Sequence, residues 1–426
     1  MDEPYIPVPI VIDPNRKQIA VITSVYGQSS HADVIAGRLL EGYGYYGENR
    51  IPRLQIISMY VDQLDKSYMA FNLSAQYGFG IYPTIRETLL MGGDSLAVDG
   101  VVLIVEHGDY PDNEKYQTLY PRYEFYKEVM DVFRETGKSV PVFTDKHLSY
   151  DWDKAKWMYD QSTELGFPLM AGSSLPVTFR RPPMEIEKET SIEKAVFTSE
   201  FGGESWGIHA LEALQCMVER REGGETGITA VQYLYDENVW QWLDENQWGE
   251  KLLDEAMLRI PDRASDSIRD IGTPELFLLE YTSGLEAVVL TNNDLINATY
   301  SGFAAKVEGN ETPISTAFWL QEGPHYNHFS GLAYHIEELI INGKPSYPVE
   351  RTLLTTGALS AIMDSQYNNG NYGNAGLRIE TPHLNIVYTA QEESVYNQGE
   401  VPPYEDIFVA EEKPVEFKLL RNYPNP

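Results

Sequence analysis

The sequence predicts an α/β fold with two domains: an N-terminal Rossmann-like parallel sheet, and a C-terminal α+β domain with a large open, mostly antiparallel sheet. Two observations predict it. Continuously apolar runs alternate with helical segments through the first domain, which is typical of a parallel sheet covered on both faces. After that, β-branched runs follow one another with turn residues between them. The expected domains cover residues 17–180 and 181–400, with an extended arm at 1–16 and an extended tail at 401–426.

The strands of the first domain are short apolar runs that end in glycine or in polar residues. They are expected at residues 18–27, 54–63, 100–108, 139–145 and 167–174. Amphipathic helices are predicted between them, at 29–44, 84–99, 120–138 and 150–166. Ser29 or Ser30 can cap the first of these helices. Gly137 and Gly166 end the last two, because glycine is the usual residue at a helix C-terminus.

The second domain is predicted to be rich in strands, with its helices on one face of the sheet. Strands are expected at 195–202, 227–236, 276–293, 296–309, 315–323 and 377–388. Helices are expected at 206–224, 329–343 and 351–370. The tryptophans Trp240, Trp242 and Trp248 are expected to serve packing, with sugar stacking as an alternative.

Composition limits the classes of partner. The formal net charge is −32, which argues against nucleic acid or an anionic membrane surface as the main partner. Cys216 is the only cysteine, so no intrachain disulfide can form. No apolar run approaches the roughly 18 residues of a membrane helix, and the first residues lack a signal-peptide pattern. We expect a soluble, cytoplasmic protein, although a leader removed earlier would leave no trace.

Ionisable residues follow two strands of the predicted parallel sheet. Glu106 and His107 end one strand, and Asp145, Lys146 and His147 end the next. Ligands of open α/β sheets bind beyond the carboxyl ends of the strands. We therefore expect these side chains to meet in one crevice, although helix capping or inter-strand bonding is an alternative for Glu106 and His107.

Three motifs carry a resemblance to a known family. "TDKHLS" follows the fourth strand, "ESWGIHALE" opens the helix of the second domain, and "YPVERTLLTTGALSAIMDS" forms the last helix. Their order and spacing resemble the Gfo/Idh/MocA family of sugar and inositol oxidoreductases, from about residue 19 to residue 388. The family's Glu-Lys-Pro tripeptide matches Asp145, Lys146 and His147, with the catalytic lysine at Lys146.

The second motif resembles the family's Asp-x-Gly-x-His-x-x-Asp pattern at the substrate site. Glu204, Gly207, His209 and Glu212 match it, with one extra residue before the glycine. The resemblance implies an alcohol oxidation in which His209 is the base and Lys146 polarises the oxygen. Glu212, three positions after His209, would orient its imidazole.

The resemblance also implies a dinucleotide and a polyol site. The expected cofactor-binding residues are Gly27, Ser29, Asp62, Glu106 and His107. The expected substrate-binding residues are His147, Arg180, His325 and His328. The family's first turn carries G-x-G-x-x-G/A, whereas this turn, "TSVYGQSSHAD", retains only Gly27. The expected cofactor is therefore NAD or NADP, with no cofactor as an equal alternative.

Other functions stay open at this stage. The many acid–base residues also suit a lyase, an epimerase or a glycosidase, with transient redox chemistry or none. A non-catalytic protein on a Rossmann scaffold is a further alternative, favoured by the missing glycines. His325, His328 and His335 are a candidate metal set, but their spacing is no known zinc signature, so no metal ligand is assigned. The expected partner is a carbohydrate or polyol, and relatives suggest a homo-oligomer.

Overall fold

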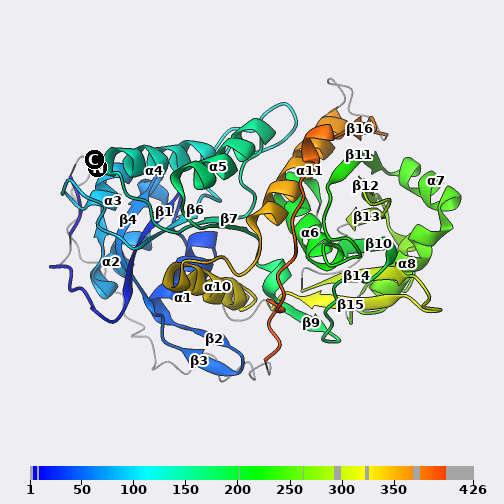
Figure 1. Ribbon diagram of the computed structural model, residues 1–426, viewed down its shortest axis with the longest axis horizontal. Helices are drawn as coiled ribbons and strands as arrows, with labels where there is room; N and C mark the ends of the chain where they lie inside the picture. The colour runs from blue at the N-terminus through cyan, green and yellow to red at the C-terminus, as the bar shows by residue number, and fades with distance from the viewer. Residues whose placement is uncertain are drawn as a thin grey trace.

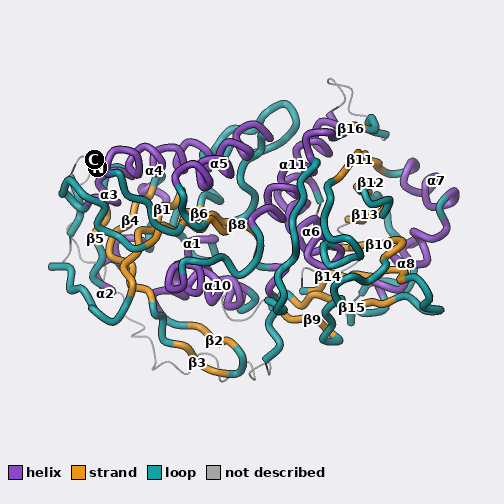
Figure 2. Tube along the Cα trace, viewed as in Figure 1, coloured by secondary structure: helices purple, strands orange, loops and turns teal. Residues whose placement is uncertain are grey.

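The structure is a computed structural model that describes residues 3–6, 9–200, 202–261, 263–291, 299–321, 326–367 and 375–399. It contains two large sheets, and helices α6 and α11 lie between them (Figures 1 and 2). The first sheet is entirely parallel and the second is mixed and mostly antiparallel. The fold class predicted from the sequence is therefore confirmed. The predicted tail at 401–426 lies outside the described residues.

The first sheet has six strands in the order β5-β4-β1-β6-β7-β8. Their bounds are β1 Lys17–Thr23, β4 Leu54–Val61, β5 Gly80–Ile81, β6 Gly100–Ile104, β7 Val142–Asp145 and β8 Leu169–Gly172. The central strands are buried on both faces, as their continuous apolar runs predict. Tyr5 of the predicted arm forms a bridge with Ile81 at the β5 edge.

Helices cover both faces of the first sheet. One face carries α3 (Ile85–Leu90), α4 (Arg122–Thr136) and α5 (Trp152–Leu165), and the other carries α1 (His31–Glu41), α2 (Ala70–Tyr77) and α10 (Phe329–Asn342). Ser30, rather than Ser29, caps α1 by accepting a hydrogen bond from the Asp33 amide. Helix α2 and the hairpin of β2 (Tyr43–Tyr45) and β3 (Glu48–Arg50) were not predicted, because each is too short to show a clear period.

The second sheet has eight strands in the order β16-β11-β12-β13-β10-β14-β15-β9. Their bounds are β9 Phe179–Arg181, β10 Ile192–Ser199, β11 Ile228–Tyr235, β12 Glu275–Tyr281, β13 Glu286–Thr291, β14 Tyr300–Val307, β15 Ile314–Trp319 and β16 Ile379–Glu380. Only β10 and β13 pair in parallel. The late strand expected at 377–388 shrinks to β16, because Pro382 has no amide hydrogen to continue the ladder and a 3-10 turn, Pro382–Leu384, follows.

Helices cover both faces of the second sheet, not one face as the sequence suggested. Helices α6 (Gly203–Val218) and α11 (Val349–Tyr367) pack on one face. On the other face pack α7 (Glu237–Glu245) and α8 (Gln247–Met257), with Trp240, Trp242 and Trp248 in partly buried packing positions. The apolar residues of these two short helices form stripes that the sequence reading overlooked.

Helix α10 comes late in the chain but belongs to the first sheet. It packs against α1, and its Ile340 lies against Gly100 at the start of β6. The chain therefore leaves the first sheet after β8, builds the second sheet and returns with α10. The contiguous domain at 181–400 expected from the sequence does not reflect this return, which depends on contacts distant in sequence.

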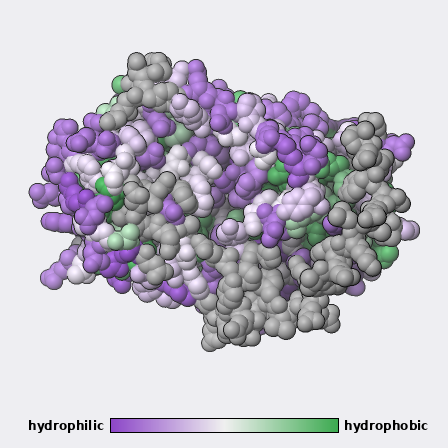
Figure 3. All heavy atoms as spheres, turned by 180° about the vertical axis from the view of Figure 1, so that it is seen from behind, coloured by the Kyte–Doolittle hydropathy of each residue, from purple (hydrophilic) through white to green (hydrophobic). Residues whose placement is uncertain are grey.

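The remaining described segments are 3-10 turns and loops. The 3-10 turns are Leu64–Lys66, Leu175–Val177 and Ile268–Asp270, besides the one already given. Among the described residues, no helix is both long and apolar enough to cross a bilayer. Hydrophilic side chains predominate on the coloured surface of the face turned away in Figure 1 (Figure 3).

Candidate active site

Lys146 and Glu106 meet at the carboxyl ends of neighbouring strands β6 and β7. The Lys146 ammonium lies 2.8 Å from Oε1 of Glu106, and Arg122 of α4 pairs with the other oxygen of that carboxylate. Burial would raise the pKa of Glu106, but the charges of Lys146 and Arg122 outweigh it and hold the pKa well below its usual range. The ammonium also donates to the backbone carbonyl of Ser205 in α6, which fixes its position between the two sheets.

Two residues beyond the ends of these strands have left-handed backbone conformations. His107 has a φ of 69° and Lys146 a φ of 58°, both uncommon for residues with a side chain. Such conformations persist only where surrounding contacts hold them, and they often occur at functional sites. They turn the chain sharply at the sheet edge, so that Glu106 and Lys146 both lie inside the molecule.

His209 lies beside this pair, on α6. Its Nδ1 is 2.5 Å from the Ser173 hydroxyl, which follows β8. Burial, and then the nearby charge of Lys146, lower the pKa of His209 well below its ordinary value. The imidazole is therefore neutral near pH 7.

Glu212 does not contact the His209 ring as the sequence suggested. Its carboxyl accepts hydrogen bonds from the Ser173 amide at 2.5 Å and from the Thr352 hydroxyl at 2.5 Å. Burial raises the pKa of Glu212 to about 7, above the 4.5 of an ordinary glutamate. His209 and Glu212 lie on the same face of α6, as their spacing predicts, but Ser173 after β8 and Thr352 of α11 are the hydrogen-bond partners of the Glu212 carboxyl. Ser173, which the motifs did not single out, is the direct partner of His209.

Asp145 pairs with a histidine from the far end of the domain. Nδ1 of His31, the first residue of α1, lies 2.5 Å from Oδ2 of Asp145. His31 is not among the site residues predicted from the sequence. Its position could have indicated it, because His31 directly follows Ser30, the N-cap of the helix after β1, and therefore lies at the carboxyl edge of the sheet.

His107 is exposed and lies beside His31. Its ring centroid is 5.2 Å from that of His31, and its Nδ1 accepts weakly from the His31 amide at 3.4 Å. Partial desolvation by neighbouring groups, followed by the charge of His31, lowers the pKa of His107 below its ordinary value. We call His31, Glu106, His107, Asp145, Lys146 and His209 the strand-end cluster.

His147 is buried beside the cluster. Its Nε2 lies 2.7 Å from Oε1 of Glu204, an ion-pair contact without good hydrogen-bond alignment. Burial lowers the pKa of His147, against the raising effect of Glu204. Burial would raise the pKa of Glu204, but its contacts with His147 hold that pKa below its usual value. With a side chain only 1% exposed, His147 supports the loop after β7 and does not reach solvent.

The other predicted substrate residues lie in different surroundings. Arg180 of β9 is buried, donates to the Met184 carbonyl and to Glu185, and stacks on Tyr396. These contacts give it a structural role in the second sheet, and the substrate role expected for it has no support from them. His328 is buried next to Phe329, whose ring contacts His31, so it adjoins the cluster. His325 lies outside the described residues.

The turn after β1 was expected to hold the diphosphate of a dinucleotide. The Gln28 amide donates to the Tyr68 hydroxyl at 2.9 Å, and the Ser29 amide donates to Oδ2 of Asp33 at 2.9 Å. Phosphate oxygens would need such amides, and the Asp33 carboxylate adds a negative charge beside them. The described turn keeps only Gly27 of the glycine pattern, so a dinucleotide diphosphate would have to displace the Tyr68 hydroxyl and the Asp33 carboxylate from these amides.

The loops beside this turn are bonded to one another. Gln63, after β4, exchanges hydrogen bonds with the backbone of Asp109, after β6. Asp62, the expected ribose ligand, accepts from the hydroxyls of Tyr60 and Tyr110 at 3.0 and 2.7 Å. The Asp62 carboxylate is thus hydrogen-bonded within the chain, as are the amides of the turn after β1.

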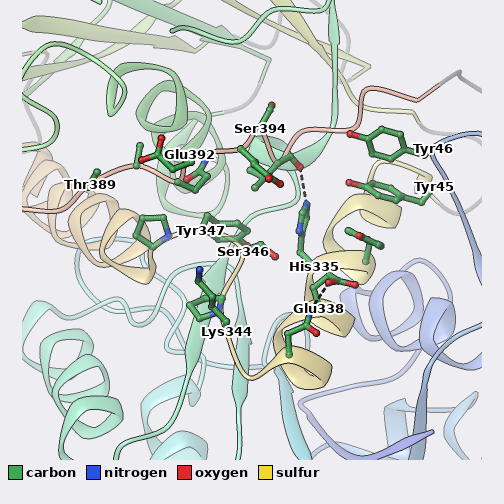
Figure 4. A pocket seen from close by; sticks show the side chains of 18 of the residues that line it. Tyr45, Tyr46, His335, Glu338, Lys344, Ser346, Tyr347, Thr389, Glu392 and Ser394 are labelled. Atoms are coloured by element: carbon green, nitrogen blue, oxygen red, sulfur yellow. Dashed lines mark hydrogen bonds between the residues drawn. The ribbon is translucent and has the colours of Figure 1, made fainter. Parts of the chain in front are cut away.

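A separate cavity of about 1140 Å³ lies between the β2–β3 hairpin, α10 and the segment 389–395 (Figure 4). Tyr45 and Tyr334 stack at 4.3 Å on one side, and Nε2 of His335 donates to the Val395 carbonyl at 2.8 Å. That hydrogen bond holds the His335 ring in the cavity wall, and its Nε2 is not free to bind the metal ion considered above. Among the described residues, no group of three or more His, Cys, Asp or Glu side chains is arranged to hold a metal ion.

Comparisons with known proteins find the fold but no sequence relative. No protein-family model matches the chain, and no curated protein matches it. GenD2 from gentamicin A biosynthesis, crystallised with NAD, is 12% identical with a TM-score of 0.54, over 88% of this chain and 99% of its own. Apo scyllo-inositol dehydrogenase from Lactobacillus casei is 10% identical with a TM-score of 0.51, over 84% and 98%.

Myo-inositol dehydrogenase from Lactobacillus casei, in complex with NAD(H) and myo-inositol, has the same fold. It is 12% identical with a TM-score of 0.50, over 89% of this chain and 99% of its own. At such identities the similarity shows a shared two-domain fold and nothing finer. The function therefore has to be inferred from the residues of the strand-end cluster.

Proposed function

We propose that the chain is an oxidoreductase of the Gfo/Idh/MocA type that acts on a sugar or polyol, with Lys146 and His209 as its acid–base residues. The observation that carries this proposal is their meeting at the carboxyl edge of the parallel sheet, held by Glu106 and Ser173. Ligands of such sheets bind at that edge. The fold shared with polyol dehydrogenases supports the substrate class.

The chain's own residues supply proton transfer. An ammonium group beside a substrate hydroxyl stabilises the negative charge that develops when the hydroxyl loses its proton. Lys146 stays in place for this because Glu106 and the Ser205 carbonyl hold it. A neutral His209 is suited to exchange hydrogen bonds with the same oxygen. A bound nicotinamide would accept the hydride in such a reaction.

A second candidate is a redox-free sugar enzyme, such as an epimerase or lyase. The observation that favours it is the turn after β1, whose Gln28 and Ser29 amides are taken by Tyr68 and Asp33. The same acid–base groups would then serve proton transfer alone.

One experiment separates the two candidates. The purified protein is denatured and the supernatant assayed for NAD(H) and NADP(H), and the native protein is titrated with both and tested on inositols and hexoses. Retained or micromolar-binding nicotinamide with polyol-dependent reduction supports the oxidoreductase. Absence of both contradicts it, and deuterium uptake from D₂O into the same sugars then tests the redox-free candidate.

Substitution of the two acid–base residues tests their roles. We expect Lys146→Met and His209→Gln each to lower kcat/KM by about 10²–10⁴-fold, the usual contribution of a proton-transfer group. Steady-state kinetics on the substrate found above measure the loss. Lys127→Met on the exposed side of α4 and His383→Gln serve as matched controls that keep activity.

Removing Lys146 alone also leaves Glu106 with less charge compensation, which can weaken the fold. The double variant E106Q/K146M avoids this, and circular dichroism confirms folding. Full turnover in folded variants of both sites would contradict the proposed roles.

A further inference from the structure

His31 combines a buried partner with access to solvent. Its Nδ1 lies 2.5 Å from Asp145, whose side chain is 1% exposed, whereas the His31 side chain is 13% exposed. The imidazole therefore connects a carboxylate inside the protein with the surface of the strand-end cluster. Aspartate in this position fixes both the orientation and the tautomer of a histidine ring.

The tautomer of His31 follows from its partner. An ionised carboxylate can only accept a hydrogen bond, so Nδ1 of His31 carries the hydrogen and donates it to Asp145. In the neutral ring, Nε2 then bears a lone pair. His31 thus keeps a proton acceptor at Nε2, in a ring that lies within 6.5 Å of the His209 ring.

The tautomer of His209 is the opposite. The Ser173 hydroxyl oxygen accepts from the Leu175 amide at 3.1 Å, and among the hydrogen bonds of the described residues its one hydrogen has no acceptor other than Nδ1 of His209, at 2.5 Å. The hydroxyl is therefore fully paired when it donates to that nitrogen. Nδ1 of His209 accepts, so its hydrogen is on Nε2. The ring is neutral near pH 7 because burial and Lys146 lower its pKa. His209 thus keeps a hydrogen-bond donor at Nε2.

We propose that His31, oriented by Asp145, is the base that takes the proton of the substrate hydroxyl, and that His209 donates a hydrogen bond to the same oxygen. This inference rests on the proposed function and reverses the role that the sequence suggested for His209. The two ring centroids are 6.5 Å apart, a spacing at which one oxygen can contact both rings.

The step is a proton transfer alone. The substrate O–H bond breaks, and a new N–H bond forms at Nε2 of His31. The electron pair stays on the oxygen as an alkoxide, which the His209 Nε2–H and the Lys146 ammonium stabilise. Asp145 stabilises the imidazolium that results, as a carboxylate next to a catalytic histidine does. The alkoxide can then enter either reaction class considered above.

Nuclear magnetic resonance of ¹⁵N-histidine-labelled protein tests the tautomers without any substrate. The chain has eight histidines, so H31Q and H209Q identify the two signals by their loss. We expect the His31 signal to show the Nδ1–H form and to change in D145N, and the His209 signal to show the Nε2–H form and to change in S173A. A His31 ring in the Nε2–H form, or one that D145N leaves unchanged, would overturn the inference. If D145N does not fold, the tautomer of His31 in the wild-type protein still tests the inference.

Kinetics test the base directly. We expect His31→Ala to lower kcat/KM by about 10²–10⁴-fold, and added imidazole to restore part of it. His383→Ala, in the 3-10 turn beside Trp152, serves as the matched control and is expected to show neither effect.

The outcomes separate the two proposals. If H31A keeps wild-type turnover while K146M loses it, the base assignment fails and the proposed function stands. If the wild-type protein turns over none of the sugars tested, the proposed function fails, and the tautomers alone decide whether His31 is set up as a base.

Discussion

At the scale of single residues, Glu212 shows how burial changes the chemistry of a side chain. Its carboxyl is enclosed between β8, α6 and α11, and its pKa rises to about 7. An unfolded chain would titrate the same group near 4.5. The folded state therefore favours the protonated form, and this contribution to stability is full below pH 4.5 and is lost as the pH rises through 7.

The variant Glu212→Gln tests this linkage. In its protonated form the Glu212 carboxyl donates to the Thr352 hydroxyl oxygen, while that hydroxyl donates to the Ala171 carbonyl. A glutamine can donate to the same oxygen and accept from the Ser173 amide, so it replaces the protonated glutamate without a lost partner. We expect the free energy of unfolding of the wild type to fall between pH 5 and pH 8 by about 2–3 kcal/mol more than that of E212Q. Urea unfolding at both pH values measures it, and equal pH dependence in the two proteins would contradict the raised pKa.

The buried charges in and beside the strand-end cluster form a linked set of contacts. Glu106 holds Lys146 and Arg122, Asp145 holds His31, and Glu204 approaches His147. Buried ion pairs contribute little net stability, because desolvation offsets their attraction. Their concentration at one sheet edge is therefore better explained by chemistry than by stability.

At the scale of elements, the return of α10 to the first sheet depends on a glycine. A Cβ built on Gly100 would lie 2.9–3.0 Å from three side-chain atoms of Ile340. Because the conflict includes both branches of the isoleucine, rotation of its tip cannot relieve it. Only glycine at the start of β6 lets α10 approach this closely.

We expect Gly100→Ala to lower the free energy of unfolding by about 1–3 kcal/mol, the usual cost of overpacking. Ile340→Ala removes the obstacle, so the double variant should be more stable than the sum of the single effects predicts. Chemical denaturation of the wild type, the two single variants and the double variant gives the coupling free energy between positions 100 and 340. Gly37→Ala on α1, whose Cβ would meet nothing closer than 3.5 Å, is a control without loss. Strict additivity would contradict the contact.

At the scale of the whole molecule, the excess of acidic side chains sets the long-range electrostatics. The net charge of −32 places many carboxylates on a hydrophilic surface (Figure 3). Like charges repel one another more strongly in the compact state than in the unfolded chain. Salt screens this repulsion over about 10 Å at 0.1 M.

Salt is therefore expected to stabilise the protein. Raising NaCl from about 0.02 M to about 0.5 M should raise the thermal midpoint by a few degrees, with most of the gain at the low end where screening changes fastest. Differential scanning calorimetry measures the shift, and KCl at equal ionic strength distinguishes screening from binding of one ion. A midpoint that falls with salt would show that attractive ion pairs dominate instead.

The sequence by itself determined the fold class, because short apolar runs that alternate with amphipathic helical segments are typical of a parallel sheet covered on both faces. It also located Glu106, Asp145, Lys146 and His209, because strand ends and a helix start are local features. Tertiary structure alone decided their partners. His31 reaches Asp145 across 114 residues of chain, and Thr352 reaches Glu212 across 140. Such pairs leave no periodic trace in a sequence, since they depend on how distant elements pack, and they determine which imidazole can accept a proton.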